Sequence, residues 1–292
     1  MITVANNERL GIALMVATTF VFSLQDGISR HLAGEYNVLM IVMIRYWFFA
    51  AFVMTVTARQ AGSVRAAAAT RQPLLQIGRG VLLALEICVA VQAFVLLGLV
   101  EAHAIFACYP LIITALSVPL LGERVGPLRW MAVGVGFLGI LVILQPGRSV
   151  FSPYAFVALT AAGMFALYGL LTRYAARRDS ASTSFFWTGV AGAVVMTVVG
   201  IAFWEPMSSG DWLWMTLLCL MGALGHWLLI RCYEVAEASA VQPFAYLQLV
   251  FASTLGVVVF GERLEAHVVL GAAIVIGAGI FALSRERARS RR

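Results

Sequence analysis

The residues of this chain that could carry chemistry are polar side chains set inside long apolar runs. Glu86 is the clearest case, because it lies nine residues into the apolar run 77–98. A lone carboxylate near the middle of a bilayer is costly and usually faces a bundle interior or a water-filled cavity. Glu86 is therefore a candidate site for a proton or for the amine of a substrate. The alternative is a structural carboxylate that neighbouring Ser, Thr or backbone groups satisfy.

Several other residues within apolar runs have aromatic rings or polar tips. A site for an amphipathic small molecule needs aromatic walls and a few hydrogen-bond partners, and these residue types supply both. Each of them alone is more often a satisfied helix-packing residue. Together with Glu86, the candidate substrate-binding residues are Gln25, His103, Tyr109, His226, Trp227, Gln242 and Tyr246.

Two charged patterns near the ends of apolar runs predict structure. Asp26 and Arg30 are four residues apart, a spacing that allows an ion pair on one helix face. The Glu-Arg pairs at 123–124 and 262–263 each close an apolar run. We interpret them as capping and snorkelling residues at the membrane surface, with gating or interface pairing as the alternative.

Motifs of enzymes are not apparent. Gly134-x-Gly136-x-x-Gly139 matches the dinucleotide fingerprint in letters, but it lies within an apolar run instead of between a strand and a helix. Small residues at this spacing favour close helix packing. No Gly-x-Ser-x-Gly, His-Glu-x-x-His or Walker sequence occurs, and the four cysteines show no Cys-x-x-Cys spacing. The sequence therefore predicts no catalytic residue, no cofactor and no metal site.

The elements that position these residues must be membrane helices. Of the 292 residues, 62% are hydrophobic and 12% are charged, whereas soluble domains have about 25% charged residues. A bilayer core of about 30 Å requires roughly 20 apolar residues per helix. We therefore predict an all-α integral membrane protein with ten transmembrane helices. The ten apolar runs are about 10–29, 37–57, 77–98, 102–121, 127–145, 153–172, 183–204, 211–231, 239–260 and 266–284.

The arginines predict the orientation in the membrane. All 20 basic residues are arginines. Sixteen fall on one side of the ten expected helices, three (Arg30, Arg148 and Arg263) fall on the other side, and Arg45 lies within a helix. Because basic residues collect on the cytoplasmic side, we expect both termini to be cytoplasmic.

An internal repeat divides the chain. Segments 101–124 and 237–263 both begin with Glu-Ala-x-Ala and end with Gly-Glu-Arg, at offsets of 136 (237 minus 101) and 139 (261 minus 122). Residues 29–30 and 172–173 match at an offset of 143 (172 minus 29). Five helices per copy is an odd number, so the second copy enters the membrane inverted. We predict two inverted five-helix repeats, 1–147 and 148–292, with the substrate site near the midplane between them.

Ten helices as five plus five, Gly-Glu-Arg after the fourth and ninth, and Gly-rich fifth and tenth helices resemble the EamA-type drug/metabolite transporter superfamily. Within it, the sequence resembles the YddG-like aromatic amino acid exporters. The resemblance implies a multi-pass protein of the bacterial inner membrane. It would export aromatic and other neutral amino acids, or related small metabolites, by alternating access, with proton coupling as one option. It would work as a monomer or homodimer and bind no nucleic acid.

Two alternatives stay open. A multidrug exporter of the same superfamily would use Glu86 to bind an organic cation. A membrane-embedded enzyme or scaffold would have no transport activity, but an enzyme needs reactive groups at fixed spacing inside the membrane, and none is visible.

Overall fold

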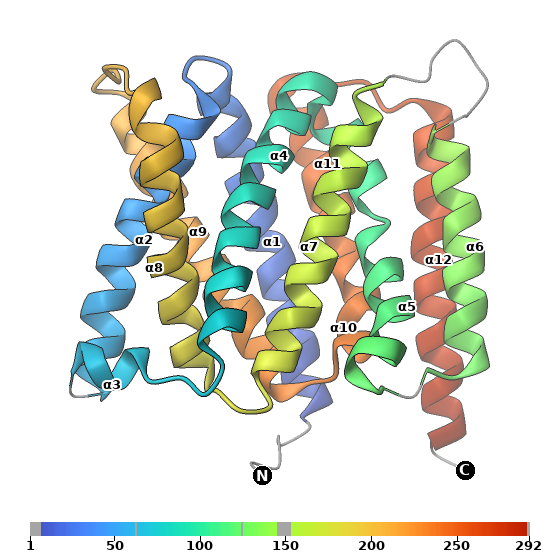
Figure 1. Ribbon diagram of the computed structural model, residues 1–292. Coiled ribbons are helices and arrows are strands. Elements are labelled where there is room, and N and C mark those ends of the chain that lie inside the picture. Colours follow the sequence, from blue (N-terminus) through green and yellow to red (C-terminus); the bar gives the residue numbers. More distant parts are fainter. Residues whose placement is uncertain (1–6, 62, 124, 145–152, 291–292) are drawn as a thin grey trace.

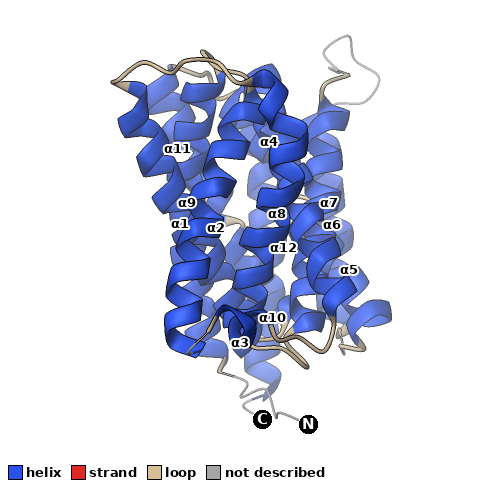
Figure 2. Ribbon diagram, turned by 60° about the vertical axis from the view of Figure 1, so that its left-hand side comes forward, coloured by secondary structure: helices blue, strands red, loops and turns tan. Residues whose placement is uncertain are grey.

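The computed structural model describes residues 7–61, 63–123, 125–144 and 153–290, and this part of the chain contains only helices and connecting loops (Figures 1 and 2). The α-helices are α1 (Glu8–Ala33), α2 (Val38–Ala61), α3 (Val64–Ala68), α4 (Pro73–Phe106), α5 (Tyr109–Leu121), α6 (Pro127–Leu144), α7 (Ala155–Ala175), α8 (Ala181–Gly200), α9 (Asp211–Val235), α10 (Ala238–Ala245), α11 (Leu247–Phe260) and α12 (Ala266–Ser290). A short 3-10 helix, Ile201–Phe203, follows α8.

Most of these helices are long and apolar enough to cross a membrane. Seven stretches within the described residues meet both conditions: Glu8–Ala33, Val38–Val56, Pro73–Phe106, Ala155–Ala175, Ala181–Phe203, Asp211–Val235 and Ala240–Phe260. Three shorter apolar helices accompany them: Tyr109–Leu121, Trp130–Ile143 and Ala266–Ala278. The prediction of an all-α membrane protein is confirmed at this level.

Helix α4 contains a sharp break. Its 34 residues would extend about 51 Å as one straight helix, but Gly98 has φ 81° and ψ 172°. Only glycine adopts this backbone conformation readily. A Cβ atom there would also lie 2.9 Å from the Glu262 carboxylate. The chain therefore turns at Gly98, and the segment Leu99–Phe106 starts a new direction.

Two of the predicted helices, 102–121 and 239–260, are discontinuous. The predicted helix 102–121 consists of the segment after Gly98 and of α5, which are separated at Ala107 and Cys108. Pro110 is the second residue of α5, where its missing N–H costs nothing. The predicted helix 239–260 is divided in the same way into α10 and α11, with Tyr246 between them.

The Gly-Glu-Arg motifs form the C-terminal caps of α5 and α11. Gly122 and Gly261 adopt left-handed backbone conformations, with φ values of 69° and 65°. The N–H of Glu123 donates to the Ser117 carbonyl at 3.2 Å, and the N–H of Glu262 donates to the Gly256 carbonyl at 3.0 Å. This is the glycine cap expected at a helix C-terminus. It turns each glutamate side chain away from the helix that it follows.

Helices from the two predicted halves pack in pairs. Helix α1 packs on α9, α4 on α7, α2 on α8, and α6 on α12. The last pair stands at one edge of the bundle (Figure 1). A Cβ atom at Gly139 would lie 2.8 Å from the Gly271 carbonyl oxygen of α12, and one at Gly136 would lie 2.9 Å from Leu111. Helix packing therefore explains two of the three glycines of the apparent fingerprint.

These contacts predict unequal effects of two alanine substitutions in α6. Gly139→Ala should destabilise the protein by about 1–3 kcal/mol, because the new methyl group overpacks against backbone of α12. Gly134→Ala is the matched control, because a Cβ atom there meets nothing within 4 Å. Thermal unfolding of both purified variants in detergent measures the difference, and equal midpoints would show that α6 and α12 do not pack closely through Gly139.

Candidate functional site

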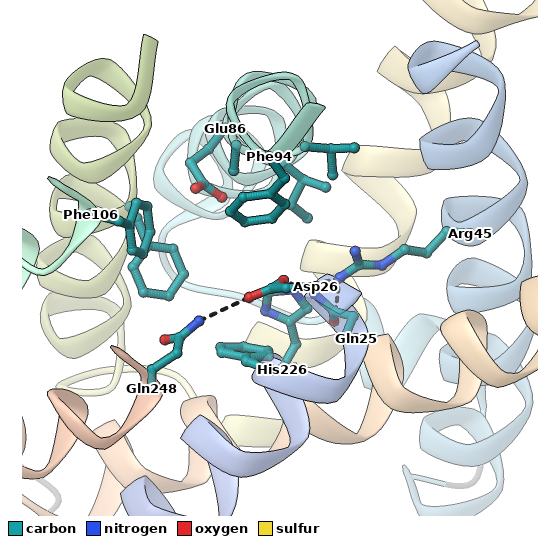
Figure 3. Close-up of a pocket in the computed structure, with 13 residues that line it drawn as sticks. Gln25, Asp26, Arg45, Glu86, Phe94, Phe106, His226 and Gln248 are labelled. Carbon is teal, nitrogen blue, oxygen red and sulfur yellow. Dashed lines mark hydrogen bonds between the residues drawn. The ribbon is translucent and has the colours of Figure 1, made fainter. Parts of the chain in front are cut away.

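A pocket lies in the middle of the bundle, where α1, α2, α4, α7, α9 and α11 meet (Figure 3). We call it the central pocket. Its free space is about 40 Å³, room for about three water molecules. It is lined by Phe22, Gln25, Asp26, Arg45, Glu86, Ile87, Ala90, Val91, Phe94, Phe106, Phe165, His226 and Gln248.

Four phenylalanine rings form the apolar wall of the central pocket. The rings of Phe22 and Phe165 have centroids 6.2 Å apart, and those of Phe106 and Phe165 are 5.5 Å apart. Phe94 stacks on the His103 imidazole at 4.8 Å with only 7° between the planes. Rings at these spacings offer flat faces on which another planar group could pack.

Glu86 and Arg45 bring opposite charges to this wall. The Glu86 side chain is buried, and its carboxylate makes no hydrogen bond or ion pair within the described residues. Figure 3 shows it across the pocket from Gln248 and His226. The Arg45 guanidinium is also buried, and one of its nitrogens bonds Gln25 Oε1 at 2.8 Å and contacts His226 Nε2 at 3.2 Å. The pocket thus presents one carboxyl group that has no partner among the described residues and one partly satisfied guanidinium.

The Arg45 contact determines the protonation of His226. A guanidinium only donates hydrogen bonds, so Nε2 of His226 must accept and Nδ1 must carry the hydrogen. The imidazole is therefore neutral. Its Nδ1 is buried and has no hydrogen-bond partner in the described part of the chain. His226 can offer this N–H to a molecule in the central pocket.

Asp26 is the centre of a hydrogen-bond network, and its partners differ from the expected one. Its Oδ2 atom lies 3.0 Å from His103 Nε2 and accepts from Gln248 Nε2 at 3.1 Å, while Oδ1 accepts from Gln25 Nε2 at 3.2 Å. The predicted ion pair between Asp26 and Arg30 is wrong. Helix α4 and α11 present partners to Asp26 that the sequence of α1 does not reveal, and Arg30 pairs with Glu262 instead.

Glu262 joins three elements at one end of the bundle. Its carboxylate accepts hydrogen bonds from the N–H groups of Leu99 at 2.9 Å and Val100 at 2.7 Å, and it forms an ion pair with Arg30. These N–H groups begin the segment after Gly98 and have no helical partner of their own. A carboxylate at a helix N-terminus is stabilising. We call this set of contacts the Glu262 clasp.

Glu123 makes the corresponding contacts for the other break. Its carboxylate accepts from the N–H of Ala238, the first residue of α10, at 3.2 Å, and it lies 3.7 Å from the guanidinium of Arg173. We call this the Glu123 clasp. Both glutamates therefore cap a helix of the opposite half, which goes beyond the predicted surface role. Arg124, the other member of that pair, lies outside the described residues.

The two clasps lie at opposite ends of the bundle. Arg30 is in the last turn of α1 and Arg173 is in the last turn of α7, and these helices end at opposite ends (Figure 1). The arginines match at the offset of 143 (173 minus 30), and the glutamates match at 139 (262 minus 123). The repeated residues thus occupy equivalent places in the two halves.

Three of the eight predicted site residues line the central pocket: Gln25, Glu86 and His226. His103 lies just behind it, against Asp26 and Phe94. Tyr109 also lies behind the wall, with its ring 5.0 Å from those of Phe106 and Phe165.

The other three predicted site residues lie elsewhere. Trp227 lines a separate apolar groove with Phe48, Phe52 and Phe185. Gln242 donates to the Tyr233 hydroxyl at 3.2 Å and to the Ala238 carbonyl at 3.1 Å, so it holds α10. Tyr246 is buried at the junction of α10 and α11. These three side chains serve the broken helix and the bundle instead of the pocket wall.

Asp26 and Arg45 line the central pocket but were not among the predicted site residues. Both lie inside apolar runs, where ionisable side chains are costly and usually functional, and this position in the sequence could have identified them. Arg79, in contrast, was assigned to the cytoplasmic side but is fully buried. Its guanidinium bonds Gln76, the Tyr168 hydroxyl, Thr172 and the Ser184 carbonyl, which ties α4 to α7 and α8.

Comparison with known proteins adds to this geometry. The EamA-like transporter family matches residues 9–145 and again residues 152–285. An S-adenosylmethionine uptake transporter of Rickettsia prowazekii (strain Madrid E) is 25% identical over 95% of this chain and 93% of its own length. A riboflavin transporter of Vibrio cholerae serotype O1 is 31% identical over 66% of this chain and 65% of its own. The pseudopaline exporter CntI of Pseudomonas aeruginosa (strain UCBPP-PA14) is 27% identical over 96% and 97%.

The crystal structure of another protein has the same fold as this chain. It superposes with a TM-score of 0.69 over 96% of both chains at 17% identity.

The contacts of Arg79 predict a structural role. Arg79→Met should lower the thermal midpoint strongly, because it leaves several buried acceptors without a donor, at about 1–3 kcal/mol for each. Arg231→Met is the control, since Arg231 forms a half-exposed pair with Glu234 three residues along and such pairs contribute about 0–1 kcal/mol. Unfolding in detergent compares the two, and equal losses would refute the role of Arg79 as a tie between helices.

Proposed function

This chain belongs to the EamA-like transporter family, and from that premise we propose that it is a secondary transporter of small zwitterionic molecules that carry a planar ring. The observation that carries the proposal is the composition of the central pocket. Two carboxylates, one guanidinium and four phenylalanine rings meet at a buried site between many helices. Such a concave, mostly aromatic site with a few placed charges is suited to binding an amphipathic small molecule.

The charges indicate how a substrate would lie. Glu86 has no partner within the described residues and would accept the substrate's ammonium or other cationic group. Arg45 would contact its carboxylate, and the planar part would pack between the rings of Phe94, Phe106 and Phe165. Aromatic amino acids have these three features. So does S-adenosylmethionine, the substrate in the name of the Rickettsia relative, which joins an amino acid, a sulfonium cation and a planar base.

A second candidate is the transport of organic cations. Arg45 is already engaged by Gln25 and His226, whereas Glu86 is not engaged. The central pocket therefore favours a cation more strongly than an anion. A substrate without a carboxylate would lose little binding free energy. We place the export of amino acids or related metabolites first, because the pocket offers both charges.

We propose ten membrane crossings, as two inverted repeats over 1–147 and 148–292. The seven long spans and three shorter apolar helices supply that number when the two broken helices count as one crossing each. Helix α1 begins and α12 ends at the same end of the bundle (Figure 1), as an even number requires. The arginine distribution supports a cytoplasmic location for that end, and we propose that the protein lies in the bacterial inner membrane.

The clasps support alternating access. Both are closed in this structure, and the central pocket has room for only a few waters, which supports an occluded conformation. Opening the Glu262 clasp would free the segment after Gly98 at one end. Opening the Glu123 clasp would free α10 at the other. Opening one at a time would expose the pocket to the periplasm and the cytoplasm in turn.

Glu86→Gln tests the substrate site. We expect the affinity for phenylalanine or S-adenosylmethionine to fall about 10- to 100-fold, because a charge-assisted hydrogen bond of about 1.5–3 kcal/mol is lost. Equal-pH exchange of each radiolabelled probe in proteoliposomes measures this, with Gln92→Ala, at an exposed position of the same helix, as the control. Unchanged affinity for both probes would place the substrate cation elsewhere. If the parent protein transports an amine without a carboxylate better than a zwitterion, the second candidate is favoured.

The clasps can be tested by accessibility. In a variant whose four cysteines are replaced by alanine, Ala90→Cys places a thiol at the central pocket. Glu262→Gln should increase its labelling by an impermeant thiol reagent several-fold from the periplasmic side, because the cap and ion pair are weakened. Glu123→Gln should increase it from the cytoplasmic side, in inside-out vesicles. Increased labelling from the same side in both variants would contradict the assignment of opposite gates.

A further inference from the structure

We infer that Asp26 and His103 form a proton-binding pair at the edge of the central pocket, and that transport exchanges this proton for the cationic group of the substrate. The occupancy of the pair follows from its own hydrogen bonds. The exchange rests on the proposed transport function, and the experiments below separate the two.

Hydrogen-bond accounting requires a proton in the pair. His103 Nδ1 lies 3.0 Å from the Leu99 carbonyl oxygen, which can only accept, so Nδ1 carries a hydrogen. His103 Nε2 lies 3.0 Å from Asp26 Oδ2, and this contact needs one hydrogen as well. The pair is therefore either imidazolium with carboxylate or imidazole with carboxylic acid. Both forms hold one proton more than a neutral imidazole beside a carboxylate.

Gln25 favours the first of these two forms. The guanidinium of Arg45 donates to Gln25 Oε1 at 2.8 Å, and this fixes which end of the amide faces Asp26. The Gln25 Nε2 group therefore donates to Asp26 Oδ1 at 3.2 Å. A carboxylate that accepts hydrogen bonds on both oxygens is stabilised as the anion. The proton then resides on His103.

The charges around the pair make the proton and a substrate cation alternatives. Asp26 is the carboxylate of the pair, and the Arg45 guanidinium reaches it only through the Gln25 amide. His226 is neutral by its contact with Arg45, and Glu86 makes no hydrogen bond to the pair within the described residues. With His103 charged, the Asp26 carboxylate has a cation in direct contact. Without that proton it has none, a state that is costly in a membrane interior and that a cationic substrate would relieve. The other titratable or charged groups facing the pair are Tyr109 from α5 and, one turn along α1, Arg30 with Glu262.

The exchange step can be written in full. As the pair opens to water, the N–H bond at His103 Nε2 breaks and a water molecule accepts the proton, which leaves neutral imidazole and the Asp26 carboxylate. The substrate cation then enters beside Asp26 and Glu86. This release of the proton and entry of the substrate take place when the pocket is open to the cytoplasm. When the periplasmic gate opens, the step runs in reverse: the substrate cation leaves, and a proton from water binds His103 Nε2. One positive charge replaces one positive charge, so export of a substrate accompanies entry of a proton.

The position of His103 links the proton to the gate. His103 lies on the short segment that begins at Leu99, directly after the break at Gly98. The same segment is held at its start by the Glu262 clasp, through the Leu99 and Val100 N–H groups. Asp26 and Arg30 are one turn apart on α1. Movement of the segment away from α1 would therefore open the clasp and the proton pair together.

The pair is present in only one half. At the repeat offsets, Asp26 corresponds to Gly169 (26 plus 143) and His103 corresponds to Ser239 (103 plus 136). Neither residue titrates. Alternating access needs a clasp at each end, and the clasps are duplicated. The proton pair is not duplicated. A device that couples one gate to an ion gradient needs only one copy.

The occupancy is tested without any substrate. Full-length protein labelled with ¹⁵N-histidine in lipid nanodiscs at pH 7 should show one imidazolium with both nitrogens protonated. This signal should vanish in His103→Gln and become that of a neutral ring in Asp26→Asn. A protonated carboxyl band in the infrared spectrum that Asp26→Asn removes would equally show a proton in the pair. A neutral His103 without such a band would overturn the inference.

The coupling is tested by transport in proteoliposomes. We expect an imposed pH gradient to drive accumulation of labelled phenylalanine or S-adenosylmethionine in the parent, and His103→Gln to reduce it at least tenfold. The ratio of this accumulation to exchange at equal pH should also fall, because exchange at equal pH does not use the proton gradient. His31→Gln, a partly exposed histidine at the end of α1, is the control. Gradient-driven accumulation at the parent level in His103→Gln would overturn the coupling.

The failures of the two proposals are distinguishable. A merely structural role of His103 would lower exchange, gradient-driven accumulation and thermal stability together, and this would refute the coupling. If the parent exchanges neither probe, the proposed substrate class fails, while the NMR result still decides whether the pair holds a proton.

Discussion

Backbone groups without partners are costly inside a bilayer, and this constraint shapes the two broken helices on which the structure depends. At Gly98 and again after α9, the chain starts a new helix whose first N–H groups have no helical acceptor. In both places a glutamate from the other half of the chain supplies the acceptor. The break in one half is therefore stabilised by the helix end of the other. Neither half can keep its broken helix in place without its partner.

This mutual dependence gives the Gly-Glu-Arg motif a physical explanation. The glycine is required because the helix must end in a left-handed conformation, with φ of 69° at Gly122 and 65° at Gly261. The glutamate follows because that turn aims its side chain at the neighbouring helix start. In each clasp, the arginine belongs to the same half as the helix start that is capped. Arg30 lies in the half that contains the segment after Gly98, and Arg173 lies in the half that contains α10. Each clasp thus joins the two halves at one end of the bundle. If both ends opened at once, both clasps would be lost.

The sequence was sufficient to predict the helical membrane fold and most of the helix positions, because hydropathy depends on residue types alone. Glu86 was found for the same reason, since the cost of an ion in lipid does not depend on its neighbours. The partners of charged residues were harder to predict. Asp26 was paired with Arg30 by their spacing on one helix, whereas α4 and α11 present His103 and Gln248 to it. Arg79 was counted with the cytoplasmic arginines, and its burial against acceptors from α7 and α8 was not predicted. These contacts join residues more than 70 positions apart in the sequence. Asp26 and His103, for example, are separated by 77 residues. Local sequence patterns do not determine such contacts.

The polar network can respond to a ligand because its hydrogen bonds join different helices. Asp26 is held by residues from α1, α4 and α11, and Arg45 is held by residues from α1 and α9. Any charge that enters the central pocket must therefore disturb contacts between helices, because few of these polar groups are satisfied within their own helix. The Gln25 amide is the shared element: it accepts from Arg45 and donates to Asp26. Displacement of the guanidinium toward a substrate carboxylate would release this amide and weaken the hold on the Asp26 carboxylate. In the proposed mechanism, binding at the cationic side of the pocket would thus be transmitted, through one side chain, to the Asp26–His103 pair.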